Sequence, residues 1–235
     1  MYKLVIFDLD NTLTDFMRMK ENAVDAAVDA MIDAGLRQPT AQIKEKIYQV
    51  YEREGIEFQM VFDEVLKEML GEVDHKVLAA GIVSYRRAKE AALVLYPHVR
   101  WTLFELIKRG IRLAVISDAP RKEGWLRLCY LQLHHMFDIV VTFDDTGERK
   151  PSPVPFERVL SYFNMRPEEA LMIGDWPERD ITGAAQVGMN TVFARYGDRW
   201  DTQESGADFD IDDIIELIEI VDGKREKKEP VSKRE

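Results

Sequence analysis

Short apolar runs alternate with segments of helical periodicity along most of the chain. Five runs are rich in aliphatic and β-branched residues, and each precedes polar, glycine or proline residues and then a helical pattern; they are 3–7, 112–116, 139–142, 170–173 and 191–194. Unbroken apolar runs of this length are typical of parallel strands covered on both faces. The pattern therefore predicts an α/β core, a doubly wound, Rossmann-like parallel sheet.

The interval between the first two predicted strands holds an insertion. Roughly a hundred residues separate these strands, whereas a crossover between parallel strands needs only about a dozen. Four apolar stripes at helical spacing fill the interval, starting near Ala23, Ile43, Phe58 and Val77. The sequence predicts an inserted all-helical cap domain of four helices around its own small core.

These patterns also predict the domain boundaries. We expect the core to comprise 1–14 and 97–222 and the helical cap to comprise 15–96, with the two chain crossings acting as a hinge. The remaining segment, 223–235, is charged and almost free of apolar residues. Segments of that composition cannot bury enough apolar surface to order themselves, so we expect this tail to be disordered.

Composition excludes several classes of protein. The 43 acidic and 32 basic side chains give a formal net charge of −11, which argues against a nucleic-acid partner. The single cysteine, Cys129, cannot form an internal disulfide, and its helical apolar surroundings predict a core position. No signal peptide begins the sequence, and the apolar runs are too short to span a membrane. We expect a soluble cytoplasmic protein with no membrane partner.

Two carboxylates follow the first predicted strand. Asp8 and Asp10 are two residues apart, which keeps both side chains on one face of an extended chain. Like charges this close raise the pKa of one carboxyl unless a cation intervenes. The alternative is a solvated strand end whose acids cap a turn, and this pair alone does not decide between the two interpretations.

Other predicted strands also end in chemically useful residues. Ser117 and Asp118 end the second strand, Lys150 lies in a loop stiffened by prolines, and Asp175 and Asp180 follow the fourth strand as a second acidic pair. Open α/β sheets bind their ligands at the carboxyl ends of the strands. We therefore expect all these groups to converge on one edge of the sheet.

The order Asp-x-Asp, Ser, Lys, Gly-Asp-x4-Asp resembles the four motifs of the haloacid dehalogenase (HAD) superfamily of phosphohydrolases, across the whole predicted core. The long helical insertion looks like the C1-type cap of that superfamily. In detail the chain looks closest to the archaeal cap-bearing phosphatases of the glyceraldehyde-3-phosphate phosphatase-like group. The resemblance implies a hydrolase with a Rossmann-like core and a helical cap.

The resemblance also implies a role for each matched residue. Asp8 is expected to be the nucleophile that forms an aspartyl-phosphate, and Asp10 the general acid and base. Mg2+ is expected to be held by the carboxylates of Asp8 and Asp175 and the backbone carbonyl of Asp10, with Asp180 acting through water or by orienting its neighbours. Oxygen-only ligands are those that Mg2+ prefers.

The remaining motif residues are expected to bind the phosphoryl group. By the same resemblance, Ser117 donates a hydrogen bond to it, helped by the backbone amide of Asp118, and Lys150 neutralises the nucleophile and the transferring group. Four other cations, Arg18, Lys20, Arg121 and Arg149, are placed where they could reach a substrate. Charged side chains at a surface are usually solvated, so none of the four is assigned a role.

The function implied is a Mg2+-dependent phosphatase acting on small phosphorylated metabolites, including a glyceraldehyde-3-phosphate phosphatase-like activity. A phosphomutase would share every one of these residues. A 2-haloacid dehalogenase does not need an acid two residues after its nucleophile, so Asp10 argues against it. A non-catalytic phospho-acceptor or binding protein is disfavoured by the chain length and the helical insertion. Monomer and homodimer both stay open.

Overall fold

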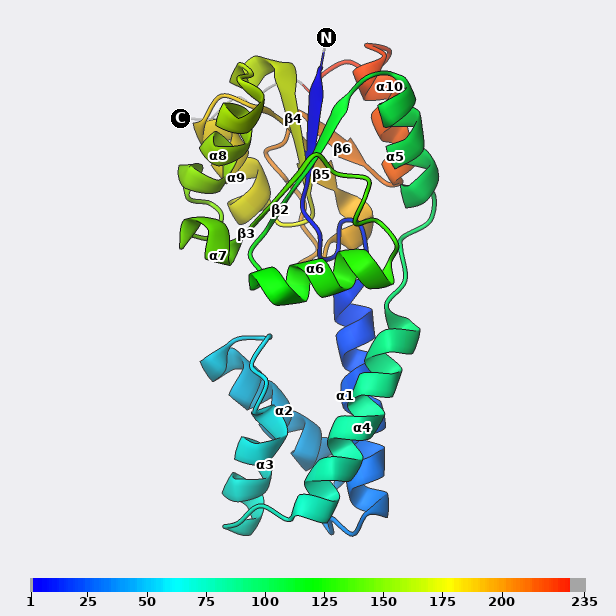
Figure 1. Ribbon diagram of the computed structural model, residues 1–235, viewed down its shortest axis with the longest axis vertical. Coiled ribbons are helices and arrows are strands. Elements are labelled where there is room, and N and C mark those ends of the chain that lie inside the picture. Colours follow the sequence, from blue (N-terminus) through cyan, green and yellow to red (C-terminus); the bar gives the residue numbers. More distant parts are fainter. Residues whose placement is uncertain (1, 229–235) are drawn as a thin grey trace. The chain divides into compact units, whose positions relative to one another are not determined.

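A parallel sheet forms the core of the protein. The computed structural model describes residues 2–228. Its six strands, in the order β3-β2-β1-β4-β5-β6, are all parallel to their neighbours (Figure 1). The strands are β1 (Leu4–Phe7), β2 (Arg112–Ser117), β3 (Ile139–Thr142), β4 (Ala170–Gly174), β5 (Asn190–Ala194) and β6 (Phe209–Ile211). The first five were predicted to within one residue at each end, and the predicted doubly wound α/β core is confirmed.

Helices cover both faces of this sheet because its strand residues are apolar on both sides. Leu4 and Ile6 of β1 belong to one apolar cluster with residues of α8 (Pro153–Phe163) and α9 (Thr182–Gln186). The intervening Val5 and Phe7 are equally buried. The core helices other than α8 and α9, including the short ones, are α5 (Val99–Lys108), α6 (Arg121–Tyr130), α7 (Phe143–Thr146) and α10 (Leu217–Val221).

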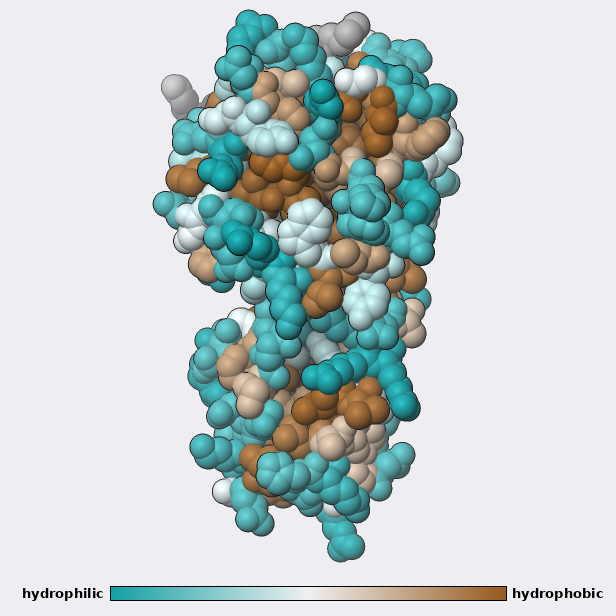
Figure 2. Space-filling view, in the orientation of Figure 1, coloured by the Kyte–Doolittle hydropathy of each residue, from teal (hydrophilic) through white to brown (hydrophobic). Residues whose placement is uncertain are grey.

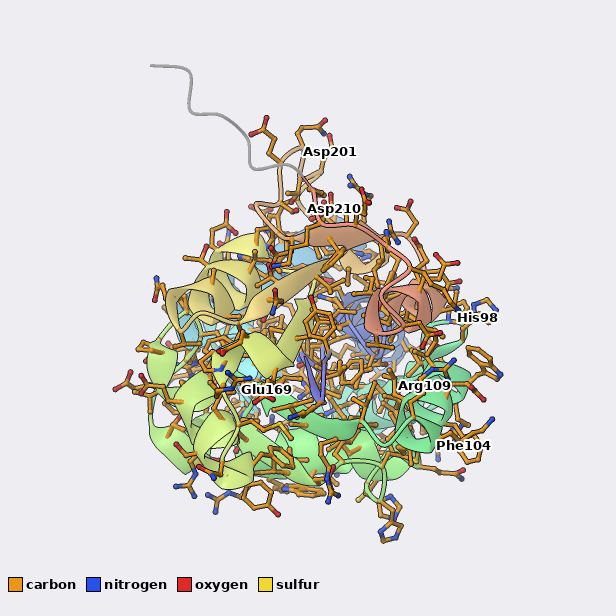
Figure 3. The ribbon with its side chains drawn as sticks, turned by 90° about the horizontal axis from the view of Figure 1, so that it is seen from above. His98, Phe104, Arg109, Glu169, Asp201 and Asp210 are labelled. Carbon is orange, nitrogen blue, oxygen red and sulfur yellow. The ribbon has the colours of Figure 1, made fainter. Side chains whose placement is uncertain are left out.

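Short helical turns complete the core. They are η1 (Pro167–Glu169), the π-helical η2 (Pro177–Ile181), η3 (Arg195–Gly197) and η4 (Ile214–Glu216). Glu169, labelled in Figure 3, holds the amino end of the sheet through an ion pair between its Oε1 and Lys3 Nζ at 2.5 Å. The opposite, carboxyl ends of the strands carry the predicted chemistry.

Residues Phe16–Val94 form a separate compact unit, which we call the helical unit. It consists of α1 (Phe16–Asp33), α2 (Thr40–Glu54), α3 (Val61–Leu70) and α4 (His75–Ala92). The four helices share one buried apolar cluster, as the stripes predict. Asp74 caps α4 by accepting the backbone N–H groups of Lys76 and Val77. Helix α2 begins at Thr40, directly after its N-cap residue Pro39.

The two ends of the helical unit meet at adjacent points of the core. Thr14 and Leu95 form an isolated antiparallel bridge, and the Tyr96 N–H donates to the Leu13 carbonyl at 3.1 Å. Among the described residues, the core therefore comprises 2–15 and 95–228. These bounds lie within two residues of the predicted hinge crossings.

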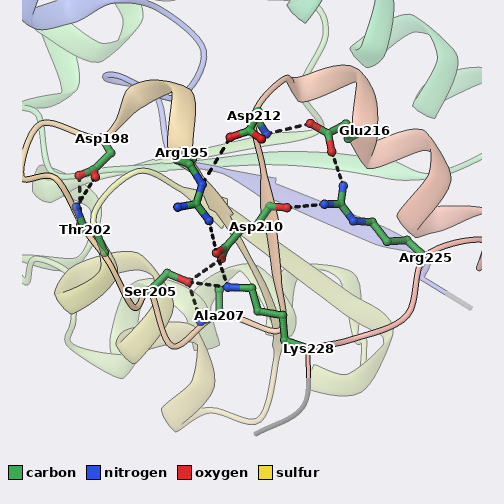
Figure 4. Close-up of polar contacts among 10 residues, drawn as sticks. All are labelled: Arg195, Asp198, Thr202, Ser205, Ala207, Asp210, Asp212, Glu216, Arg225 and Lys228. Carbon is green, nitrogen blue, oxygen red and sulfur yellow. Dashed lines mark hydrogen bonds and ion pairs between the residues drawn. The ribbon is translucent and has the colours of Figure 1, made fainter. Parts of the chain in front are cut away.

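The described part of the charged segment after Gly223 lies against β6. The Lys228 N–H donates to the Asp208 carbonyl at 2.8 Å, and Arg225 pairs with Glu216. The segment was predicted to be disordered from 223; residues 224–228 instead make these contacts, and 229–235 lie outside the described residues. Figure 4 shows Arg225 and Lys228 within one network of polar contacts.

Apolar side chains are not confined to the interior. Figure 2 shows patches of brown, apolar residues among the teal, hydrophilic ones on the face that it draws. Cys129 is exposed, contrary to the core position predicted for it, because it lies on the outer side of α6 between buried Leu128 and exposed Tyr130. Within residues 2–228, no helix combines the length and apolarity needed to cross a membrane.

Candidate active site

The register of the sheet brings the first and fourth motifs together. Phe7 of β1 lies opposite Ile173 of β4, and the Asp8 N–H donates to the Ile173 carbonyl at 2.9 Å. Asp8 and Asp175 therefore leave adjacent strands at the same level. Ser117 ends β2 on the other side of β1. The predicted convergence at one edge of the sheet is observed for these strands.

Three buried carboxylates form a compact cluster at this edge. One oxygen each from Asp8, Asp175 and Asp180 lies within 4.8 Å of the other two, and the three residues are at most 7% exposed. Thr12 Oγ1 donates to Asp175 Oδ1 at 3.0 Å, and the Trp176 N–H donates to Asp180 Oδ2 at 3.1 Å. The carboxylates are thus held in place by neighbours in the first and fourth motifs.

Lys150 lies inside this cluster. Its Nζ bonds to Asp8 Oδ1 and donates to Asp180 Oδ1 at 2.6 Å, with the lysine side chain 3% exposed. The Lys150 N–H donates to Asp118 Oδ1 at 2.9 Å, and Asp118 Oδ2 accepts from Arg179 at 3.0 Å. The Asp118 side chain therefore ties the lysine loop to the loop after β4.

Burial and mutual repulsion shift the pKa values of the cluster. Burial raises the pKa of Asp8 to about 8, with Lys150 opposing the rise and the carboxylate of Asp180 adding to it. Burial likewise raises the pKa of Asp175 and of Asp180. Burial tends to lower the pKa of Lys150, but Asp180 and Asp8 outweigh it and keep this pKa above its ordinary value. Lys150 therefore stays protonated, and its single positive charge is smaller than the total negative charge of the three carboxylates when they are ionised.

A divalent cation fits this cluster. Asp8, Asp175 and Asp180 offer only oxygen donors. Burial raises the pKa of all three carboxyls, so a bound cation would favour their ionised forms. Mg2+ prefers oxygen ligands and usually takes one or two carboxylates together with water. The donor set of these three carboxylates therefore suits the predicted metal.

Two glycines make room for the site. A Cβ on Gly174 would lie 2.2 Å from the Asp180 carboxyl carbon, and a Cβ on Gly197 would lie 1.7 Å from the Asn11 carbonyl oxygen. Tyr196, beside the second glycine, donates its hydroxyl to the Thr12 carbonyl at 2.9 Å. Sequence reasoning did not assign Gly197 a role, because nothing local shows that η3 packs against the Asn11 loop.

Ser117 and Asp10, the other predicted catalytic residues, have separate local contacts. Ser117 is 3% exposed, and its Oγ accepts the Ala119 N–H at 3.2 Å. The Asp10 side chain is 24% exposed, and its Oδ1 lies 3.1 Å from Nε of Arg127. Arg127 was not singled out from the sequence, because an arginine within an amphipathic helix normally faces solvent.

Three of the four additional cations have local partners within their own units. Arg121 pairs with Asp145 at 2.6 Å, and the Arg149 guanidinium lies 4.0 Å from the centre of the Phe143 ring. Lys20 is buried in the helical unit, where its Nζ lies 4.3 Å from the centre of the Tyr51 ring. Arg18 is also part of the helical unit.

Comparison with known proteins agrees with this geometry. A family described as haloacid dehalogenase-like hydrolase matches residues 5–194. The glyceraldehyde 3-phosphate phosphatase of Methanocaldococcus jannaschii is 35% identical over 224 residues, covering 94% of this chain and 97% of that protein. The protein of the same name from Methanothermobacter thermautotrophicus is 34% identical over 226 residues, covering 94% of this chain and 100% of its own.

A solved structure shows the same fold. The HAD phosphatase of Thermococcus onnurineus superimposes with a TM-score of 0.68 at 25% identity, covering 95% of this chain and 99% of that one. The predicted superfamily is confirmed, and the predicted class of enzyme, a phosphoric monoester hydrolase, agrees with these matches. The motifs, the sheet and the full-length similarity together establish that the chain belongs to the haloacid dehalogenase-like hydrolase family.

Proposed function

We propose that the protein is a Mg2+-dependent phosphatase that hydrolyses small phosphorylated metabolites through an aspartyl-phosphate. The observation that carries the proposal is the position of Asp8, buried between the Lys150 ammonium group and the carboxylates of Asp175 and Asp180. A carboxylate held beside a fixed cation at a metal-competent cluster is placed to attack phosphorus. Bound Mg2+ would be held by Asp8, Asp175 and the Asp10 carbonyl and would neutralise phosphoryl oxygens.

In the first step, an oxygen of Asp8 forms a bond to phosphorus while the bond from phosphorus to the ester oxygen breaks. Asp10 gives its proton to the departing alkoxide, so that an alcohol leaves. Lys150 balances the charge of the nucleophile and of the phosphoryl oxygens, and Ser117 donates a hydrogen bond to them. The product is an acyl phosphate on Asp8.

In the second step, Asp10 takes a proton from a water molecule whose oxygen attacks phosphorus. The bond from phosphorus to Asp8 breaks, which releases inorganic phosphate and restores the Asp8 carboxylate. Asp10 is then protonated again for the next turnover. The same residue serves as acid and as base because the two steps move a proton in opposite directions.

Glyceraldehyde 3-phosphate is the first substrate to test. The two archaeal relatives are named glyceraldehyde 3-phosphate phosphatases, and this chain matches them along nearly their whole length. We assign the helical unit, Phe16–Val94, the role of a cap that selects small substrates. A cap of this kind excludes bulk water while the phosphoryl group is transferred.

Hydrolysis of glyceraldehyde 3-phosphate and p-nitrophenyl phosphate, with and without Mg2+, tests this function. We expect Mg2+-dependent release of inorganic phosphate, and its loss in Asp8→Asn with the fold retained. Asp212→Asn is the matched control, because Asp212 is 83% exposed and lies on the loop after β6. Full activity of Asp8→Asn contradicts the mechanism, and phosphoryl transfer to a sugar phosphate without release of phosphate indicates a mutase.

A further inference from the structure

Arg127 is a buried cation that the steps above do not use. Arg127 lies on α6, and its side chain is 2% exposed. It is the largest fully buried side chain within residues 2–228. A guanidinium out of contact with water costs several kcal/mol unless a charged or hydrogen-bonding partner offsets the loss. Its Nε lies 3.1 Å from Asp10 Oδ1. Burial lowers the pKa of Arg127, and the negative charges of Asp10 and Asp8 partly oppose this shift.

The contact makes the two oxygens of Asp10 unequal. Oδ1, beside Arg127, has essentially no accessible surface. The side chain as a whole is 24% exposed, so its accessible surface lies on its other atoms. The contact is an ion pair, and an oxygen that faces a guanidinium, which has only N–H groups, does not carry a proton of its own. The proton used in catalysis therefore belongs on Oδ2.

Arg127 also completes the charge balance of the site. Asp8, Asp175 and Asp180 together carry three negative charges when ionised, which Lys150 and a divalent cation would offset. Arg127 supplies the positive charge that faces Asp10, whose carboxylate becomes negative once its proton has left. Asp118 is already paired with Arg179 at 3.0 Å.

We propose that Arg127 is a positioning residue that holds Oδ1 of Asp10 and thereby presents Oδ2 to the leaving group. This inference rests on the proposed phosphatase function and on Asp10 as its general acid. A guanidinium is planar and stays charged at every working pH, so it fixes the carboxylate more firmly than a flexible ammonium group does. Arg127 itself touches neither substrate nor metal in this arrangement.

The proposal predicts a dependence on the leaving group. An alkoxide is a strong base and must be protonated as it departs, whereas p-nitrophenolate leaves without help. We use kcat/KM because it reports the steps up to formation of the aspartyl-phosphate and leaves out its later hydrolysis. Replacing a residue that acts only through the general acid should therefore lower kcat/KM strongly for alkyl esters and hardly at all for the aryl ester.

The test measures kcat/KM for Arg127→Met, Asp10→Asn and the double variant on one aryl and one alkyl ester. The aryl ester is p-nitrophenyl phosphate. The alkyl ester is glyceraldehyde 3-phosphate or glycerol 2-phosphate, whichever the wild type hydrolyses faster. We expect Arg127→Met to lower kcat/KM about 100-fold for the alkyl ester and less than about 5-fold for the aryl ester, within the range of general acid catalysis. In the Asp10→Asn background, Arg127→Met should change kcat/KM less than about 2-fold, because the two residues act as a unit.

Arg100→Met is the structural control. Arg100 donates to the Leu131 carbonyl at 3.0 Å and so holds the end of α6 without contacting Asp10. We expect this variant to have the same relative effect on both esters. Should Arg127→Met not fold, Arg127→Lys keeps the charge without the planar group, and we expect the same selectivity with a smaller loss.

Equal losses on both esters, or additive losses in the double variant, would overturn the role of Arg127 while leaving the phosphatase intact. Wild-type protein that hydrolyses neither ester with Mg2+ present would refute the proposed function, and the role of Arg127 with it. The two failures are therefore distinguished by the wild-type rates.

Discussion

Gly174 has a role that only the three-dimensional contact reveals. A Cβ at this position would lie 2.2 Å from the Asp180 carboxyl carbon, well inside van der Waals contact. We expect Gly174→Ala to push Asp180 away from Lys150, to lower kcat at least about 100-fold and to cost about 1–3 kcal/mol of stability through overpacking. Steady-state kinetics and chemical denaturation measure these two effects.

Gly124→Ala is the matched control for this substitution. A Cβ there would lie 3.5 Å from the Thr142 methyl group, which is an ordinary contact, and Gly124 lies within helix α6. Alanine has the higher helix propensity, so the control should be neutral or stabilising by up to about 1 kcal/mol. Unchanged activity in Gly174→Ala would show that the Asp180 position is not needed for catalysis.

The buried carboxylates predict how Mg2+ and pH act together on stability. The ordinary pKa of Asp8 is near 3.8, and burial raises it to about 8 in the folded protein without metal. Between these values the folded state binds more protons than the unfolded state, so the free energy of unfolding falls as pH rises. Mg2+ bound at this cluster would displace the proton, so we expect it to bind more tightly at pH 8 than at pH 5.

We therefore expect Mg2+ to raise Tm more at pH 8 than at pH 5. At about 100 times its Kd the metal contributes ~2.7 kcal/mol, which corresponds to roughly 5–10 °C for a chain of this length. Thermal unfolding at the two pH values, with EDTA as the metal-free reference, measures the difference. Asp175→Asn should lose most of the increase, and an increase that is larger at pH 5 would contradict this account.

At the residue scale, the site residues that could be predicted are those whose spacing along the chain reveals them. Asp8, Asp10, Asp175 and Asp180 stand out because acids directly after apolar strands are unusual, and parallel strands must bring them to one edge. Arg127 was missed because its partner is far away in the sequence. Its burial depends on how α6 packs against the first motif, and no helical periodicity contains that information.

At the scale of elements, β6 depends on a polar hub. Asp210, labelled in Figures 3 and 4, has its side chain 11% exposed. It pairs with Arg195 at 2.5 Å, accepts from Ser205 Oγ at 2.6 Å and contacts Lys228. One carboxylate thus links η3, the loop before β6 and the segment that follows α10.

We expect Asp210→Asn to destabilise the protein by about 1–2 kcal/mol, at the lower end for charged hydrogen bonds because both cations are partly exposed. Asp212→Asn removes a carboxylate that is 83% exposed and lies 3.4 Å from the same arginine, so it should cost almost nothing. Urea denaturation of the two variants compares these effects directly. Equal stability of the two variants would show that the contacts of Asp210 do not contribute measurably to the free energy of unfolding.

The same hub explains why β6 was not predicted. Asp210 interrupts the apolar run that marks the other five strands, and the strand has only three residues. The π-helical turn η2 was also unforeseen, since its sequence Pro177–Ile181 reads as an acidic loop. The five longer strands and the four helices of the helical unit were predicted because each carries several residues of one periodicity. β6 and η2 instead depend on contacts with neighbouring elements.

At the scale of the whole molecule, the chain has two units with separate apolar cores. The Thr14–Leu95 bridge and the bond from the Tyr96 N–H to the Leu13 carbonyl bring the two ends of the insertion together within the core. Every residue of the carboxylate cluster, together with Lys150, belongs to the core. The core therefore contains all the groups assigned to chemistry, and the helical unit contains none.

Replacing Phe16–Val94 by a Gly/Ser linker of about four residues, a common length for a connection, should accordingly leave a folded core. We expect this variant to unfold cooperatively, to keep the Mg2+-dependent rise in Tm, and to hydrolyse p-nitrophenyl phosphate. Because we propose that the helical unit selects the substrate, the kcat/KM for glyceraldehyde 3-phosphate should fall at least about tenfold further than that for the aryl ester. Asp8→Asn in the same background must abolish both activities. A shortened protein that folds and responds to Mg2+ yet keeps the wild-type preference between the two esters would show that selectivity lies in the core and not in the helical unit.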